Sequence, residues 1–183
     1  MKKQSTFGYI VRLGVTLLVI TGIVALALAG VNAVTAPVIA QLNEQKTQQA
    51  IEQVLPGGGE ELESFVDETG MVMAVYASEI GYAIKVAPQG FGGEIQMMVG
   101  VDKDGKVLGV SIISQVETAG LGAVMAAKTQ KGEDFRDQYI GLSGELAVDK
   151  DGGTIDSIAS ATISSRAVTQ GVNAALACAA NLG

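Results

Sequence analysis

The stretch that decides the fold is "EIQMMVGVDKDGKVLGVSII", residues 94–113. Two runs rich in apolar and β-branched residues, 94–101 and 106–113, flank the dipeptide Asp104-Gly105. Asp-Gly between two such runs is a strong signal for a tight hairpin turn. The stretch therefore predicts two antiparallel neighbours in a β-sheet.

Further elements follow on both sides of this hairpin. The runs 71–77 and 81–87 predict two more strands, and a short strand is expected at 145–148. Short helices are expected at 120–128 and 133–139, and an amphipathic helix at 164–182, in which Cys178 packs among apolar neighbours. The predicted class is α+β, an antiparallel meander with helices at one side. The two "DKDG" sequences, at 102–105 and 149–152, lack the later Glu of an EF-hand and predict tight turns.

The N-terminal part reads as a membrane segment. Residues 13–34 carry no charge and are long enough to cross a bilayer as a helix. A cleaved signal peptide is the alternative, but its apolar region is usually shorter. We expect a cytoplasmic N-terminus at 1–12, a transmembrane helix at 13–36, a juxtamembrane helix and linker at 37–59 with the helix ending at Pro56, and a folded domain at 60–183.

Charge is distributed unevenly along the chain. The residues before Glu44 carry a net charge of +3, and the remainder carries −10. Basic residues ahead of the apolar segment place the N-terminus in the cytoplasm and the C-terminal domain on the outer side of the cell membrane. An acidic domain repels phosphates, so no nucleic-acid partner is expected.

The inventory of reactive side chains is small. The chain has no histidine and one cysteine, which excludes histidine general-base catalysis, an internal disulfide and a CxxC redox pair. Redox work would therefore need a bound cofactor. No catalytic residue and no metal site are predicted within this chain.

The stretch "DSIASATISSRAV", residues 156–168, places Thr162 directly ahead of the C-terminal helix. A helix N-terminus attracts anions through its free N–H groups and its dipole, and small neighbours let a phosphate approach the backbone. The Arg166 guanidinium is a candidate second contact. The alternative is an ordinary N-cap followed by tight packing. A hydrolase nucleophile is disfavoured because neither a histidine nor a Ser-x-x-Lys sequence is present.

Two blocks of the sequence resemble one protein family. "DSIASAT" (156–162) is similar to the flavinylation sequence Asp-x-x-Ser/Thr-Gly-Ala-Thr, and residues 90–123 are similar to the block "GYGG…VGID…GKI…ETPGLGA". Both belong to the FMN-binding G subunit of the Rnf electron-transport complex and to the related C subunit of the sodium-pumping NADH:quinone reductase. Ala159 and Ser160 depart from the first block, and Ala119 replaces the proline of the second. Loss of glycine at position 160 would strain the loop if that position requires a positive φ.

The resemblance implies a covalent flavin. Thr162 would carry FMN through a phosphoester bond made by a flavin transferase, with FAD as donor and magnesium as metal, and Asp156 would belong to the sequence that the transferase reads. Phe91 is a candidate ring contact, and Lys85 a candidate for balancing the charge of the reduced flavin. The other residues expected at the flavin are Glu117, Thr118, Leu121, Gly122, Ser160, Ala161, Ile163 and Ser164.

The leading hypothesis is a membrane-anchored flavoprotein subunit of an Rnf-type ferredoxin:NAD oxidoreductase, coupled to sodium or proton translocation. Its partners would be the other Rnf subunits, the flavin transferase and membrane lipid. Two alternatives remain open: the C subunit of a sodium-pumping NADH:quinone reductase, and a non-redox exported binding or assembly module. Residues 60–183 would be the FMN-binding domain under the first two hypotheses.

Overall fold

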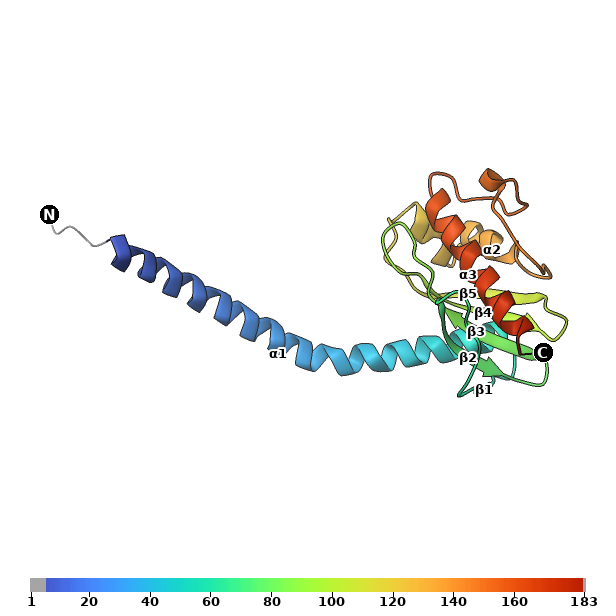
Figure 1. The fold of residues 1–183 in the computed structure, drawn as a ribbon, viewed down its shortest axis with the longest axis horizontal. Coiled ribbons are helices and arrows are strands. Elements are labelled where there is room, and N and C mark those ends of the chain that lie inside the picture. Colours follow the sequence, from blue (N-terminus) through green and yellow to red (C-terminus); the bar gives the residue numbers. More distant parts are fainter. Residues whose placement is uncertain (1–5, 183) are drawn as a thin grey trace. The chain divides into compact units, whose positions relative to one another are not determined.

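The computed structural model describes residues 6–182, and side-chain environments are described for residues 8–182. By its internal contacts the chain divides into two compact units, with the boundary between Glu44 and Gln45. Figure 1 gives the order of the helices and strands along the chain.

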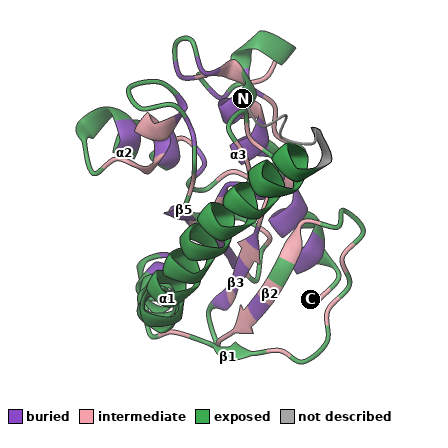
Figure 2. Cartoon of the chain, turned by 90° about the vertical axis from the view of Figure 1, so that its left-hand side faces the viewer, coloured by how far each residue is buried: buried purple, intermediate pink, exposed green. Residues whose placement is uncertain are grey.

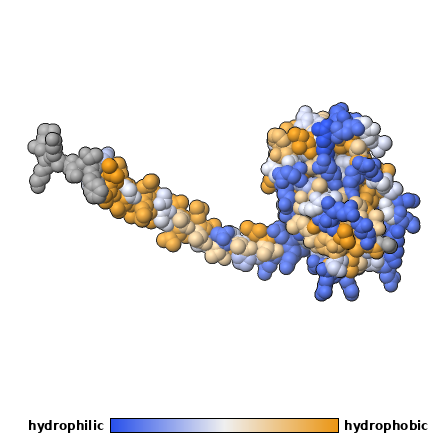
Figure 3. Space-filling view, in the orientation of Figure 1, coloured by the Kyte–Doolittle hydropathy of each residue, from blue (hydrophilic) through white to orange (hydrophobic). Residues whose placement is uncertain are grey.

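The first unit consists of most of helix α1 (Thr6–Val54). The part from Gly8 onward is long and apolar enough to cross a membrane, and its large apolar side chains as far as Leu42 are exposed (Figures 2 and 3). Threonine hydroxyls along it donate back to main-chain carbonyls, as Thr35 does to Val31 at 3.0 Å. Such bonds satisfy polar groups where water is absent. The expected N-terminal segment 1–12 lies partly outside the described residues and is helical from Thr6 onward.

The expected juxtamembrane helix is the last part of α1. The helix runs through Pro37 without a break and ends at Val54, two residues before Pro56. A proline disfavours the α conformation in the residue before it, which accounts for the end of the helix near Leu55. The sequence predicted a transmembrane helix and a separate juxtamembrane helix, whereas in the structure both belong to the single helix α1.

The second unit is built on the predicted antiparallel meander. Its strands are β1 (Glu60–Glu61), β2 (Val72–Ala77), β3 (Gly81–Val86), β4 (Gln96–Asp102) and β5 (Val107–Ser114), in the sheet order β1-β2-β3-β4-β5. In the β4–β5 turn, Asp102 Oδ1 accepts the N–H groups of Asp104 and Lys106 at 2.9 and 2.7 Å, and Gly105 has φ +76°. The hairpin prediction is confirmed.

Helices cover both faces of this sheet. Helix α3 (Thr162–Ala180) packs on one face against β2, β3 and β4, and buries Cys178 as expected. The last turns of α1 cover the other face with Ile51 and Val54. A Cβ on Gly100 would lie 2.3 Å from the Val54 carbonyl oxygen, so only glycine allows this close crossing. The expectation of helices at one side is therefore incomplete, because α1 supplies a second layer.

The region between β5 and α3 holds short elements. The expected helices at 120–128 and 133–139 correspond to the 3₁₀ helix η1 (Gly122–Ala126) and to α2 (Gln130–Asp137). The second "DKDG" forms the 3₁₀ helix η2 (Asp149–Asp151), closed by Gly152 at φ +83°.

The predicted strand at 145–148 is wrong. Only Val148 makes an isolated bridge, to Ile155, and no strand edge lies beside Leu146. Instead the Asn173 side chain on α3 accepts the Leu146 N–H at 3.0 Å and donates to the Leu146 carbonyl at 2.9 Å. A side-chain amide thus replaces the missing strand neighbour.

Candidate functional site

A pocket of about 380 Å³ lies at the N-terminus of α3. Its size falls within the range of small-molecule sites in proteins. Three separate segments form it: the loop after β3, the loop after β5, and the start of α3. The residues that line it are Phe91, Glu117, Thr118, Leu121, Gly122, Ser160, Ala161, Thr162, Ile163 and Ser164. The structure therefore brings together in one pocket the nine residues that the sequence placed at the flavin, along with the candidate ring contact Phe91.

Thr162 is the first residue of α3. Ala161 occupies the N-cap position, no side chain caps the helix, and the first turn contains no acidic residue. The first N–H groups of a helix have no intrahelical partners, and here the pocket lies in front of them. The ordinary N-cap interpretation of this stretch is therefore wrong, and the helix end is open to an anionic group.

The loop before Thr162 is held in an unusual conformation. Ser160 has φ +63°, the one non-glycine residue with a positive φ in the described part of the chain. The Ser165 hydroxyl accepts the Ile158 N–H and donates to the Ala161 carbonyl, both at 3.0 Å. Position 160 thus requires the left-handed region that glycine adopts without penalty, and Ser165 stabilises the turn.

Glu117 joins the three segments of the pocket. Its side chain is buried, and Oε1 accepts the Gly92 N–H at 2.8 Å while Oε2 accepts a hydrogen bond from the Ser164 hydroxyl. A Cβ on Gly122 would lie 2.6 Å from Glu117 Oε2, and a Cβ on Gly90 2.3 Å from Oε1. These glycines are therefore required for the close approach of the two loops to the carboxylate.

The outer wall of the pocket is apolar. Phe91, Leu121 and Ile163 expose 68%, 39% and 51% of their surfaces. Exposed apolar side chains around a concave site are typical of a surface that a planar ligand covers. The residues present therefore fit a group with a phosphate at one end and an aromatic ring system at the other.

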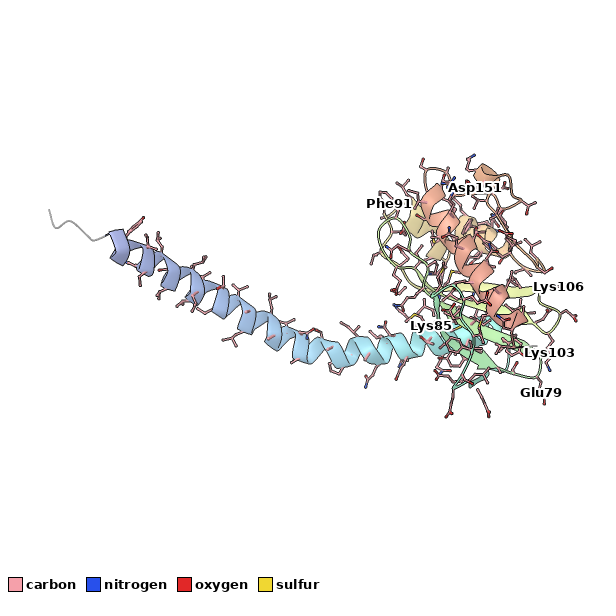
Figure 4. The ribbon with its side chains drawn as sticks, viewed as in Figure 1. Glu79, Lys85, Phe91, Lys103, Lys106 and Asp151 are labelled. Carbon is pink, nitrogen blue, oxygen red and sulfur yellow. The ribbon has the colours of Figure 1, made fainter. Side chains whose placement is uncertain are left out.

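Three other candidates lie outside the pocket. Lys85 is on β3, in register with Met98 of β4, and does not line the pocket. Arg166 forms a two-pronged ion pair with Asp151, with both N–O distances 2.6 Å, and the carboxylate raises the pKa of this guanidinium. Figure 4 labels Phe91 and Asp151 at one end of the domain and Lys85 beside the strands. Neither predicted cation therefore lines the pocket.

The third of these candidates, Asp156, is exposed and lies six residues before Thr162, in the segment that leads into α3. The Gln138 side chain holds its main chain, accepting the Asp156 N–H at 2.7 Å and donating to its carbonyl at 3.3 Å. The carboxylate itself points to no partner among the described residues. Gln138 was missed by the sequence reasoning, since nothing in its local pattern indicates a contact 18 residues away.

Comparisons with known proteins bear directly on this pocket. Residues 90–177, which include every residue of the pocket, match a family described as an FMN-binding domain. The G subunit of the Na⁺-translocating ferredoxin:NAD⁺ oxidoreductase complex of Acetobacterium woodii is 34% identical over 99% of this chain and 97% of that protein. This chain belongs to the family of Rnf G subunits.

Other G subunits support the same assignment. The G subunit of a proton-translocating ferredoxin:NAD⁺ oxidoreductase complex from Clostridium ljungdahlii is 34% identical over 86% of this chain and 83% of that protein. The G subunit of the ion-translocating oxidoreductase complex of Methanosarcina acetivorans is 27% identical over 91% of this chain and 93% of that protein. The family resemblance found in the sequence is confirmed, and as an Rnf G subunit the chain carries an FMN-binding domain.

Proposed function

We propose that this chain is the membrane-anchored flavoprotein subunit of an ion-translocating ferredoxin:NAD oxidoreductase, and that it relays electrons through FMN attached covalently to Thr162. One observation supports the proposal above the others: Thr162 opens an uncapped helix inside a pocket of the FMN-binding domain. The named relatives are subunits of multi-subunit complexes, so the other subunits are the expected partners.

Each part of the pocket has a role in holding the flavin. The free N–H groups at the start of α3 and the helix dipole would stabilise the phosphate. Leu121, Ile163 and Phe91 would pack against the ring, and Gly122 lets Glu117 and Ser164 approach closely in the wall of the pocket. The bound flavin supplies one- and two-electron chemistry, which the side chains of this protein lack.

Maturation requires a separate flavin transferase. The Thr162 hydroxyl oxygen would form a bond to the FMN phosphorus of FAD, the pyrophosphate bond would break, AMP would leave, and the hydroxyl proton would pass to a base of the transferase. Asp156 is exposed beside this loop and is accessible to such an enzyme. Ser160 adopts the left-handed conformation, which glycine adopts without penalty, so serine at this position is compatible with a loop that glycine would also form.

The membrane anchor is helix α1. We propose that it stays in the lipid with the N-terminus in the cytoplasm, because the positive charges of the N-terminal part precede the apolar segment. The FMN-binding domain would then lie on the outer side. Alkaline phosphatase fused after Gly183 should be active in cells, and an inactive fusion at normal expression would contradict this orientation.

The attachment is tested by mass spectrometry and in-gel flavin fluorescence after co-expression with the transferase. In Thr162→Val, we expect the peptide that contains position 162 to lose the mass added by FMN, and the fluorescent band to disappear from the gel. Thr118→Val, which removes the other threonine hydroxyl of the pocket, should retain both. A colourless wild-type protein would instead favour the non-redox module, and FMN retained covalently in Thr162→Val would exclude Thr162 as the attachment residue.

A further inference from the structure

The pocket contains one charged side chain. Among the ten residues that line it, Glu117 is the only one with a charged side chain. The sequence predicted cations near the flavin, but Arg166 is paired with Asp151, and Lys85 lies on the sheet. The pocket therefore carries one negative charge and neither of the two predicted cations.

This carboxylate is buried without a counter-ion. The ion pairs of the described residues are Lys150–Asp149 and Arg166–Asp151, and neither involves Glu117. Both of its oxygens accept hydrogen bonds, as an ionised carboxylate does. Hydrogen bonds from a main-chain N–H and a hydroxyl hold the charge in place but do not neutralise it.

We propose that Glu117 lowers the reduction potential of the flavin by holding a fixed negative charge in the wall of its pocket. This inference rests on the proposed function in that FMN must occupy the pocket. An electron that enters the flavin from a reductant adds one negative charge unless a proton follows. A like charge in a partly buried site, with no cation beside it to screen it, makes that addition less favourable. The effect requires only proximity, not a reaction of Glu117.

The test is a spectroelectrochemical titration with dithionite as the electron donor, on the full-length flavinylated chain in detergent. Glu117→Gln keeps the size of the side chain and one acceptor oxygen for the Gly92 N–H, its amide N–H can donate to the Ser164 hydroxyl, and the charge is removed. We expect it to shift the one-electron equilibrium toward reduction at least tenfold, which is about 59 mV. Glu133→Gln removes an equal charge at an exposed site outside this pocket and should leave the potential unchanged.

A second variant acts in the opposite direction. Ser164→Ala removes a hydroxyl dipole that points at the carboxylate and leaves the charge itself. We expect a lower potential than in the wild type. If Glu117→Gln fails to fold or to take up flavin, the Ser164→Ala variant alone tests the proposal. A flavin potential in Ser164→Ala equal to that of the wild type would then overturn it.

The outcomes separate this inference from the proposed function. A wild-type protein without flavin would contradict the proposed function. Flavin bound at normal stoichiometry, with equal potentials in the wild type and Glu117→Gln, would contradict the role of Glu117 alone. A lower potential in Glu117→Gln would overturn it equally, because loss of a negative charge cannot make reduction harder by this mechanism.

Discussion

At the scale of single residues, position 160 shows how a sequence departure is accommodated. The family pattern has glycine there, and this chain has serine at φ +63°. A non-glycine residue in the left-handed region costs about 1–2 kcal/mol. The chain tolerates that cost because Ser165 holds the surrounding loop through two hydrogen bonds.

Restoring the glycine should therefore stabilise the protein. We expect Ser160→Gly to raise the free energy of unfolding by about 0.5–1 kcal/mol, since relief of strain exceeds the added flexibility of glycine. Chemical denaturation of the wild type and the variant measures the difference. Ala159→Gly, at a neighbouring position without a positive φ, should be neutral or destabilising. Equal stabilisation by both changes would show that strain at position 160 is not the cause.

At the scale of elements, the loop between η2 and α3 is held by carboxylates. Hydrogen bonds from Ser157 and Lys150 hold the pKa of Asp149 well below its ordinary value of 3.8. The ion pair with Arg166 similarly lowers the pKa of Asp151. A carboxyl group with a lowered pKa in the folded state stabilises that state above its unfolded pKa, and the contribution is lost as the pH falls toward the folded pKa.

This linkage predicts a pH-dependent effect of one substitution. Asp149→Asn should melt at a lower temperature than the wild type above pH 3.8, and the difference should shrink as the pH falls below that value. Melting temperatures followed by circular dichroism across this range measure it. Asp104→Asn, whose carboxylate accepts no hydrogen bond among the described residues, serves as the control for general charge effects. A difference that stayed constant down to the lowest pH would contradict the assignment.

At the scale of the whole molecule, helix α1 also contributes to the core of the FMN-binding domain. Its last turns bury Ala50, Ile51 and Val54, together with Leu55 just beyond the helix, against one face of the sheet. Full burial of one such aliphatic side chain contributes about 1.5–3 kcal/mol, and a domain of this size has a total stability of about 5–15 kcal/mol. The end of α1 is therefore needed for the stability of the flavin domain.

Truncation should reveal this dependence. A chain that begins at Gln45 keeps these contacts and should be soluble, monomeric and cooperative in thermal melting. A chain that begins at Gly57 exposes Met98 and Ile113 and should aggregate or melt without cooperativity. Size-exclusion chromatography and circular dichroism distinguish the two. Equal melting temperatures for both chains would show that the end of α1 contributes little.

The sequence by itself determined the features that depend on neighbours along the chain. The apolar run of α1, the Asp-Gly hairpin and a C-terminal helix, expected from residue 164 and observed from Thr162, were all predicted, because each is encoded by local composition or by a short periodicity. The family blocks added which residues were expected at the flavin, and these residues line one pocket.

Only the tertiary structure decided how separate segments join. Glu117 contacts Gly92 and Ser164, which are 25 and 47 residues away along the chain, and Asn173 replaces a strand neighbour for Leu146 at a separation of 27 residues. Such contacts depend on which side chains meet once the sheet and helices pack. Local periodicity carries no information about that meeting, and so the hydrogen bonds that hold the buried Glu117 and the second helical layer could be found only in the folded molecule.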